Sequence, residues 1–468
     1  MRPDKPDKPD NPDSREAESR TPSPPRPREG GRRTPPGPDA SATPPDFFRD
    51  DALVADPYPY LDELRARCPV QREPHHGVMM VTGYEEAVEV LQDPRTFSSC
   101  LSVTGPFPGF PVPLEGDDVS DLIARHRDEL PMSDQLPTLD PPEHTAHRAL
   151  LMRLITPKRL KQNEEAVWDI ADTLLDGYLA RGEGEFISGF AGPFSLLVIA
   201  DLLGVPEEDR EEFLDRLQRG PAAGGAVGST GDDTLAHSPL EFLYTRFTAY
   251  IDDRRRDPRD DVLTGLATAT FPDGSLPEVA DAVRVAANLF SAGQETTVRL
   301  LGSAVKVLAE QPDLQALLRA EPGRVPNFVE ESLRTESPVK GDFRLSRVAT
   351  AVGGVEIPAG TTLMIVNGAA NRDPGRFENP ATFDPARGNA RHHLAFGRGI
   401  HTCPGAPLAR TEARVALARL LARTTDIRIS ESAHGPRTDR RYRYLPTYIL
   451  RGLTQLHLEF SRAQGSPS

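Results

Sequence analysis

The sequence predicts a mainly α single domain with small β-sheets. Segments with the period of an amphipathic helix outnumber short strand-like runs, and most of those runs come after Ser337. The chain has 468 residues and shows neither an internal repeat nor a second block of alternating elements. Helices packed around one core, with small sheets beside them, fit this pattern.

The N-terminal segment differs from the rest of the chain in composition. Proline-rich repeats such as PDKPDKPDNPD fill residues 1–45, with almost no aliphatic side chains. Such a segment buries too little apolar surface to offset its chain entropy. We therefore expect a disordered Pro-rich arm over residues 1–45, a globular domain over residues 46–462 and a short flexible tail over residues 463–468.

The first part of the globular domain predicts short elements followed by a long loop. A helix is expected within residues 56–70, a strand at residues 77–82 and a second helix at residues 84–91. Residues 97–139 are irregular and rich in proline, glycine and phenylalanine. Loops of this length are usually lids or binding loops, or else disordered. Phe107 and Phe110 suit the wall of a pocket.

Helical patterns dominate the middle of the chain, and strand-like runs follow. The helical segments are residues 143–155, 163–181, 191–203, 207–219 and 239–256, the last after a flexible glycine-rich connection at residues 220–233. The strand-like runs are residues 344–348, 355–357, 362–366, 444–450 and 456–460.

A longer helix is predicted over residues 276–309, where apolar side chains recur at helical spacing. Its middle, AGQETT at residues 292–297, places a glycine, a carboxylate and two threonines on a helix that should be buried. One interpretation is a glycine for close helix packing beside an exposed polar turn. The other is a local opening, bent by a threonine that bonds back to a carbonyl, which holds Glu295 and Thr296 ready to relay protons.

The stretch LAFGRGIHTCPG, residues 394–405, comes directly before another helical pattern. We call it the cysteine loop. Gly397 and Gly399 allow positive φ and a close approach to something flat. At the start of a helix, free N–H groups and partial positive charge favour a thiolate at Cys403. The loop alone leaves three roles open for this thiolate: nucleophile, redox thiol or metal ligand.

Composition excludes several classes of protein. No run of about 18 apolar residues and no apolar signal segment is present, so we expect a cytoplasmic protein without a membrane span. The three cysteines, Cys68, Cys100 and Cys403, lack C-x-x-C spacing, which argues against a disulfide framework and a structural zinc site. A net charge of -15 disfavours binding to nucleic acid or to anionic membranes.

Two further motifs carry charges that a buried site can use. In FVEESLR, Glu331 and Arg334 are three residues apart and share one helical face. PATFDPAR ends at Arg387, shortly before the cysteine loop. An exposed ion pair would be ordinary surface decoration. The alternative is a partly buried carboxylate shared by two guanidiniums.

These motifs together resemble one known family. FGRGIHTCPG is similar to the haem-binding signature of the cytochrome P450 family, and AGQETT, EESLR and FDPAR follow the order of that family's other motifs. The resemblance covers residues 46–460. It implies the cytochrome P450 fold, with a single haem-containing domain, and a soluble bacterial-type haem-thiolate monooxygenase. Cys403 would be the axial thiolate on the iron of haem b.

The same resemblance implies roles for the other motifs. Glu295 and Thr296 would form the acid–alcohol pair that delivers protons to dioxygen, and Glu331, Arg334 and Arg387 would form a structural triad that braces the cysteine loop. His144, Arg148, Arg344 and His401 would bind the haem propionates, while Phe396 would shield the thiolate. The implied cofactor-binding residues are His144, Arg148, Ala292, Gly293, Arg344, Phe396, Gly397, His401, Cys403 and Gly405.

The resemblance also implies where a substrate lies. The long loop, the turns around residues 219–238 and the long helix would surround an apolar small organic molecule. The candidate pocket residues are Phe107, Phe110, Phe290, Val339, Lys340 and Ile449. Lys340 either faces the pocket and pairs with a substrate carboxylate, or lies at the surface.

The expected partners are dioxygen, ferredoxin and ferredoxin reductase, because the chain has no room for a flavin reductase after the haem domain. An acidic ferredoxin would dock on a basic patch formed by Arg391, Arg398, Arg410 and Arg414. A peroxide-driven haem peroxygenase and a non-catalytic haem sensor or carrier are the alternative functions. The presence of Glu295 and Thr296 disfavours the peroxygenase.

Overall fold

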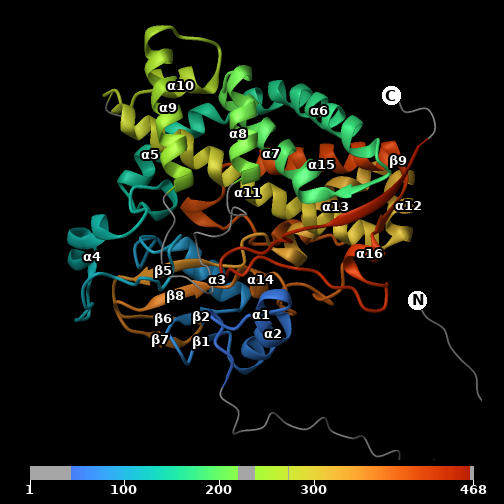
Figure 1. The fold of residues 1–468 in the computed structure, drawn as a ribbon. Helices are drawn as coiled ribbons and strands as arrows, with labels where there is room; N and C mark the ends of the chain where they lie inside the picture. The colour runs from blue at the N-terminus through green and yellow to red at the C-terminus, as the bar shows by residue number, and fades with distance from the viewer. Residues whose placement is uncertain (1–43, 220–237, 272–273, 464–468) are drawn as a thin grey trace, which may run out of the picture. The chain divides into compact units, whose positions relative to one another are not determined.

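The computed structural model describes residues 44–219, 238–271 and 274–463. The predicted arm and tail and the glycine-rich connection at residues 220–233 lie almost entirely outside these residues. The described chain has a helix-rich part and a sheet-rich part. Helix α11 lies between helices α6 to α9 and the sheet that contains β5 and β8, and α1, α2, α3 and α14 lie beside that sheet (Figure 1). A mainly α domain with small sheets is therefore confirmed.

The helices are α1 Ala52–Ala55, α2 Tyr58–Arg67, α3 Tyr84–Gln92, α4 Ser120–His126, α5 Glu143–Leu154, α6 Pro157–Leu179, α7 Gly192–Leu203, α8 Glu207–Arg219, α9 Ser238–Arg256, α10 Val262–Thr268, α11 Val279–Glu310, α12 Pro312–Ala320, α13 Val325–Glu336, α14 Asn367–Ala370, α15 Ala406–Arg423 and α16 Glu431–His434. None of the described helices is both long and apolar enough to cross a membrane.

Local signals explain several helix ends. Thr156 caps α6 because its hydroxyl accepts a hydrogen bond from the Arg159 N–H (3.2 Å), and Pro157 occupies the first helical turn. Gly204 ends α7 with a positive φ of 87°. The sequence prediction missed α10 and α12, which are short helices flanking α9 and α11.

The long helix α11 forms the centre of the main hydrophobic cluster. Its apolar face, including Val283, Ala286, Leu301 and Leu308, is buried among side chains from α6, α7, α9, α13 and α15. Burial of a helix along this much of its length fixes its position in the domain. The polar turn at residues 292–297 is therefore held at a defined place, beside the cysteine loop that precedes α15.

The largest sheet has the strand order β1-β2-β8-β5-β3. Strands β2 and β8 are parallel, and the other pairs are antiparallel. The smaller sheets are β4-β10-β9 and the β6-β7 hairpin. The strands are β1 Val70–Arg72, β2 Met79–Val81, β3 Phe97–Ser98, β4 Glu183–Glu185, β5 Asp342–Ser346, β6 Thr350–Val352, β7 Val355–Ile357, β8 Thr362–Ile365, β9 Thr424–Ile429 and β10 His457–Arg462.

One predicted strand is wrong. Residues 444–450 form only isolated bridges, Tyr444 with Leu453 and Val339 with Leu450, instead of a strand. Pro446 has no backbone N–H for a ladder, and the Thr447 side chain accepts hydrogen bonds from the N–H groups of Ile449 (3.1 Å) and Leu450 (3.3 Å). A turn replaces the strand here.

The loop at residues 97–139 is more ordered than predicted. It contains β3, α4 and two short 3₁₀ turns at residues 127–129 and 136–138. Its side chains divide between two environments. Ser102, Val103, Leu136 and Pro137 line the central cavity, whereas Phe107 and Phe110 pack elsewhere. The binding-loop interpretation therefore fits the two ends of the loop rather than its aromatic middle.

Candidate active site

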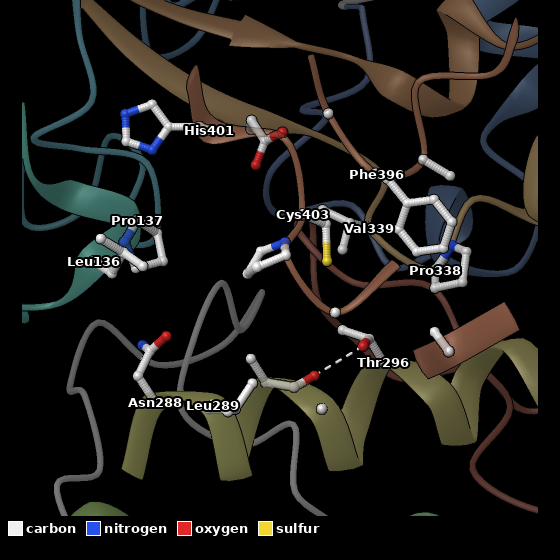
Figure 2. Close-up of a pocket in the computed structure, with 18 of the residues that line it drawn as sticks. Leu136, Pro137, Asn288, Leu289, Thr296, Pro338, Val339, Phe396, His401 and Cys403 are labelled. Atoms are coloured by element: carbon white, nitrogen blue, oxygen red, sulfur yellow. Dashed lines mark hydrogen bonds between the residues drawn. The ribbon is translucent and has the colours of Figure 1, made fainter. Parts of the chain in front are cut away.

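A cavity of about 270 Å³ lies between α11 and the cysteine loop. Figure 2 shows the Cys403 sulfur directed toward α11, with Thr296 on the facing helix wall. The cavity is also lined by the first turns of α15, the start of β5, both ends of the long loop and residues of α3, α5, α7 and α13. The structure therefore brings together the cysteine loop and the polar turn of α11, as predicted.

The two glycines of the cysteine loop have different tasks. Gly397 has a φ of 64° and lines the cavity, where an added Cβ would have no atom closer than 3.8 Å. Gly399 has a φ of 73°, and a Cβ there would lie 2.3 Å from the Leu91 carbonyl oxygen of α3. Of the two, only Gly397 lies where a flat group in the cavity would approach the loop closely. Gly399 instead allows the loop to pack on α3.

The start of α15 does not by itself lower the pKa of Cys403. Burial raises its pKa, although the Gly405 and Ala406 N–H groups and the charges of Arg148 and Arg410 act in the opposite direction. The sequence predicted a lowered pKa for the Cys403 thiol without a ligand. That prediction is wrong, because the effect of burial is larger than the effects that lower the pKa. A bound metal deprotonates a coordinating thiol outright. Ligation therefore fits Cys403 better than attack or redox cycling.

A buried charge cluster braces this region as predicted. Arg334 donates two hydrogen bonds to the Glu331 carboxylate (2.7 and 2.8 Å), and Arg387 donates a third (3.0 Å). Glu331 and Arg334 have no exposed side-chain surface. The two guanidiniums also donate to carbonyls of the segment at residues 371–382, which leads toward the cysteine loop.

A second buried carboxylate, which the sequence analysis missed, ties α13 to α15 and to His393, the residue directly before the cysteine loop. Glu330 accepts hydrogen bonds from both sides: from Arg410 (2.7 and 3.0 Å) and from the ring of His393 (3.1 Å). Burial raises the pKa of Glu330, but these hydrogen bonds and the Arg410 charge outweigh burial and lower it to about 2. Glu330 directly precedes Glu331 in the FVEESLR motif, so the two adjacent glutamates could have pointed to it.

Glu330→Gln is expected to change how stability depends on pH. Because the folded-state pKa lies below the unfolded value, the ionised group stabilises the fold above the unfolded pKa and loses this contribution as pH falls. The advantage of the wild type over Glu330→Gln should shrink by about 2 kcal/mol between about pH 5 and about pH 3. Urea unfolding at several pH values measures this. Parallel pH curves for the two proteins would contradict the assignment.

Positive and hydrogen-bonding groups gather on the cavity wall. Arg148 and Arg344 line it together with His401, whose ring contacts the Ser99 hydroxyl (3.0 Å). Arg148 also donates to the Thr402 carbonyl, which fixes it beside Cys403. Burial and the nearby charge of Arg344 lower the pKa of His401 to about 2. An anion in the cavity would relieve this concentration of positive charge.

His144 lies behind these residues and does not line the cavity itself. Its ring centroid is 4.1 Å from that of His401, and neither ring nitrogen has a hydrogen-bond partner among the described residues. Burial, followed by the Arg148 charge, lowers the pKa of His144 to about 4. Orphaned buried nitrogens indicate a missing polar partner. The cavity-lining residues Arg148, Arg344 and His401 therefore fit a group with carboxylates, as haem has, and His144 lies behind them.

The polar turn of α11 is only partly arranged as predicted. Thr296 lines the cavity and its hydroxyl donates to the Ala292 carbonyl (2.8 Å), which confirms the expected back-bond. Ala292 and Gly293 also line the cavity. Glu295 does not, because its carboxylate is held by Arg299 one helical turn later (2.9 Å). Thr296 therefore lies in the cavity wall, whereas Glu295 lies behind that wall.

The predicted substrate pocket needs correction. Only Val339 of the six residues lines the described cavity. Phe107, Phe110 and Ile449 belong to a separate hydrophobic cluster around Phe48 and Tyr448, and Phe290 packs against Phe213 and Phe247. Aromatic type alone did not reveal which cavity or cluster each side chain faces. The turns proposed at residues 219–238 lie almost entirely outside the described residues.

Both interpretations of Lys340 are wrong. The side chain is buried, and its amine donates to the Thr447 carbonyl instead of facing the cavity. Burial, with a smaller contribution from the Arg451 charge, lowers the pKa of Lys340 to about 7. The partner of Lys340 is thus the Thr447 carbonyl, in the turn at residues 444–450, and not a substrate carboxylate.

The predicted basic patch is largely neutralised. Arg410 binds Glu330, Arg414 binds Glu164 (2.5 Å), and Arg398 lines the cavity. Arg391 keeps an exposed side chain (69%), although its guanidinium lies 3.6 Å from Glu330. The sequence prediction overestimated the free positive charge because Glu330 and Glu164, which pair with two of these arginines, are distant in the sequence.

Two polar residues of the cavity were missed by sequence reasoning. Asn288 lies on α11 four and eight residues before Ala292 and Thr296, so it shares their helix face, and this spacing could have revealed it. Glu412 lies on α15, is buried, and has its carboxyl pKa raised well above the usual range by burial. Leu136, Pro137 and Leu289 supply an apolar wall near Asn288 (Figure 2).

Comparisons with known proteins agree with this geometry. The family model described as Cytochrome P450 matches residues 240–425. Cytochrome P450 144 of Mycobacterium tuberculosis is 34% identical over 419 residues, covering 88% of this chain and 90% of that protein. The cytochrome P450 monooxygenase PikC of Streptomyces venezuelae is 33% identical over 445 residues, covering 94% and 98%. The solved structure of substrate-free Mycobacterium marinum cytochrome P450 CYP150A6 is similar with a TM-score of 0.83 and 55% identity, covering 90% of this chain and 99% of that one.

Proposed function

The chain belongs to the cytochrome P450 family, and on that premise we propose that it uses dioxygen and externally supplied electrons to hydroxylate or epoxidise an apolar small organic molecule. The protein is a monooxygenase whose cofactor is haem b, and Cys403 would hold the haem iron as a thiolate ligand. Bound haem supplies the redox chemistry that transfers one oxygen atom. The protein's own residues bind the cofactor, orient the substrate and move protons.

The single observation that carries the proposal is the placement of Cys403 and Thr296 on opposite walls of one cavity. A thiolate ligand on one side and a hydroxyl on the other leave room for a flat cofactor between them. Arg148, Arg344 and His401 are our candidates for the propionate partners, since charge-assisted hydrogen bonds hold carboxylates best. His144 would orient the ring of His401, with which it is in contact.

Thr296 is our candidate for the group that passes protons on the cavity wall formed by α11. Its O–H donates to the Ala292 carbonyl, so the oxygen can accept a proton-bearing partner from the cavity side. Glu295 is the candidate reservoir behind it, and its burial raises the pKa of the carboxyl against the opposing charge of Arg299. A raised pKa keeps a carboxyl closer to the protonated form that a donor needs.

The remaining lining supports an apolar substrate. Leu136, Pro137, Leu289 and Val339 present hydrocarbon to the cavity near the helix wall. Ferredoxin and ferredoxin reductase are the proposed electron donors. With Arg398, Arg410 and Arg414 already engaged, docking would depend on the exposed Arg391 and on surface shape more than on a large basic patch.

Turnover of wild-type and Thr296→Ala enzyme tests this function. The wild type should convert substrate with NADH, reductase and ferredoxin, and its product should contain one atom from labelled dioxygen. Thr296→Ala should retain haem and substrate but form roughly tenfold to a hundredfold less product per NADH, releasing peroxide instead, because protons are delivered less well. NADH, peroxide and product are measured together.

Ser303→Ala is the matched control, because it removes a hydroxyl from the same helix at a buried position outside the cavity lining. It should remain coupled like the wild type. Normal coupling in Thr296→Ala would refute the proton role. Product formation by the wild type with peroxide alone, and none with electrons and dioxygen, would replace the proposal with a peroxygenase. Haem binding without product from either oxidant would favour a haem sensor or carrier.

A further inference from the structure

A chain of side-chain amides connects the cavity to the helix layer. Asn288 Nδ2 donates to Gln135 Oε1 (2.9 Å), and Gln135 Nε2 donates to the Tyr244 hydroxyl (2.6 Å) and to Asp134 Oδ1 (3.0 Å). The three segments involved are α11, the end of the long loop and α9. Gln135 is 2% exposed, so its amide makes these contacts away from solvent.

The direction of each hydrogen bond in this chain is fixed by Asp134. Its other carboxylate oxygen lies 2.8 Å from Arg284 Nε, so the carboxylate is paired with a cation and acts as an acceptor. The Gln135 group that faces Asp134 must therefore be the NH₂ group. The Gln135 carbonyl then faces Asn288 and accepts from the Asn288 NH₂ group. A reversed Gln135 amide would place two acceptors in contact.

The direction of these hydrogen bonds determines which atom of the Asn288 amide is left to bind a ligand in the cavity. Its NH₂ group is engaged by Gln135, and its Oδ1 has no hydrogen-bond partner in the part of the chain that the structure describes. Figure 2 shows Asn288 extending from α11 toward the cavity beside Leu136 and Pro137. A fixed carbonyl acceptor in an apolar wall selects ligands with a hydrogen-bond donor, because a ligand without one leaves that acceptor unpaired.

The distance between Asn288 and Thr296 along α11 sets the length of a suitable ligand. Asn288 lies eight residues before Thr296 on one helix face, which corresponds to about 12 Å at the rise of an α-helix. A molecule anchored at Asn288 and oxidised beside Thr296 must span a comparable distance, on the order of 10 Å.

We propose that Asn288, oriented by Gln135, is a specificity-determining residue that binds the hydroxyl of an elongated apolar alcohol and directs oxidation to the end of the molecule remote from that hydroxyl. The inference rests on the proposed function, since it names the substrate class for the same cavity. Hydroxyl and N–H donors share this chemistry, and the alcohol is favoured because the surrounding residues Leu136, Pro137 and Leu289 are apolar.

Binding of a matched pair of probes tests the proposal. The probes are 4-cyclohexylcyclohexanol, which has a donor, and 4-cyclohexylcyclohexanone, which has only an acceptor at the same place. Haem-loaded enzyme is titrated with each, and the shift of its absorption spectrum gives Kd. The wild type should bind the alcohol about five- to tenfold more tightly than the ketone, and Asn288→Leu should abolish the preference. Gln135→Leu should weaken it, because the Asn288 amide can then turn over.

Gln294→Leu is the control, because it removes an amide from the same helix outside the cavity lining and should keep the preference for the alcohol. Equal Kd values in the wild type, a preference that survives in Asn288→Leu, or no spectral shift with either probe would overturn the proposal. These readouts need no turnover. A failed preference in enzyme that oxidises other substrates refutes only the inference, whereas absence of turnover on any substrate refutes the proposed function.

Discussion

Arg334→Lys is expected to lower the free energy of unfolding by about 3–5 kcal/mol and to prevent stable retention of haem. Arg334 is fully buried, and its guanidinium binds both oxygens of Glu331 while donating to the carbonyls of Asn371 and Pro380. Lysine carries its charge on one nitrogen and cannot reproduce this planar set of contacts. Chemical unfolding and the ratio of haem to protein after gel filtration measure the two effects.

Arg391→Lys is the matched control for this prediction. Arg391 also lies near a buried carboxylate, but its side chain is largely exposed, so its replacement should change stability by less than about 0.5 kcal/mol. If Arg334→Lys were as stable as Arg391→Lys and kept a full complement of haem, the brace between α13 and the segment at residues 371–387 would not have the importance we assign to it.

Cys403→Ala is expected to reduce monooxygenase turnover below detection. Alanine cannot provide the thiolate that donates electron density to the iron, and nothing else in the loop replaces that donation. Cys68→Ala is the control, because that thiol donates to the Val70 carbonyl outside the cavity lining and should be dispensable for turnover. Product formation at a normal rate by Cys403→Ala, with dioxygen and reductant, would contradict the ligand assignment.

Contiguous motifs made the centre of the site predictable. The cysteine loop, Thr296 and the Glu331 cluster each left more than one role open when taken alone. Their roles could be predicted because the motifs together, in this order, resemble those of one family. The long helix could also be predicted, since its apolar period continues on both sides of the polar turn. The other long helices were predicted from the same periodicity of apolar residues.

The direction of individual side chains could not be predicted from the same patterns. Glu295 is held by Arg299, and Lys340 reaches a carbonyl more than a hundred residues away. Arg410 and Arg414 find carboxylates on distant helices. Each outcome depends on tertiary neighbours that the local sequence does not name. Asn288 is different, because its spacing from Thr296 along one helix face was available to sequence reasoning.

The absorption spectrum of the reduced carbon monoxide complex tests the central claim, the ligation of haem iron by Cys403, most directly. We predict a Soret band that is red-shifted relative to a histidine-ligated haem protein in the wild type and in Cys68→Ala, and its loss in Cys403→Ala. A red-shifted band that persists in Cys403→Ala, or a wild-type band at the position typical of histidine ligation, would contradict the claim.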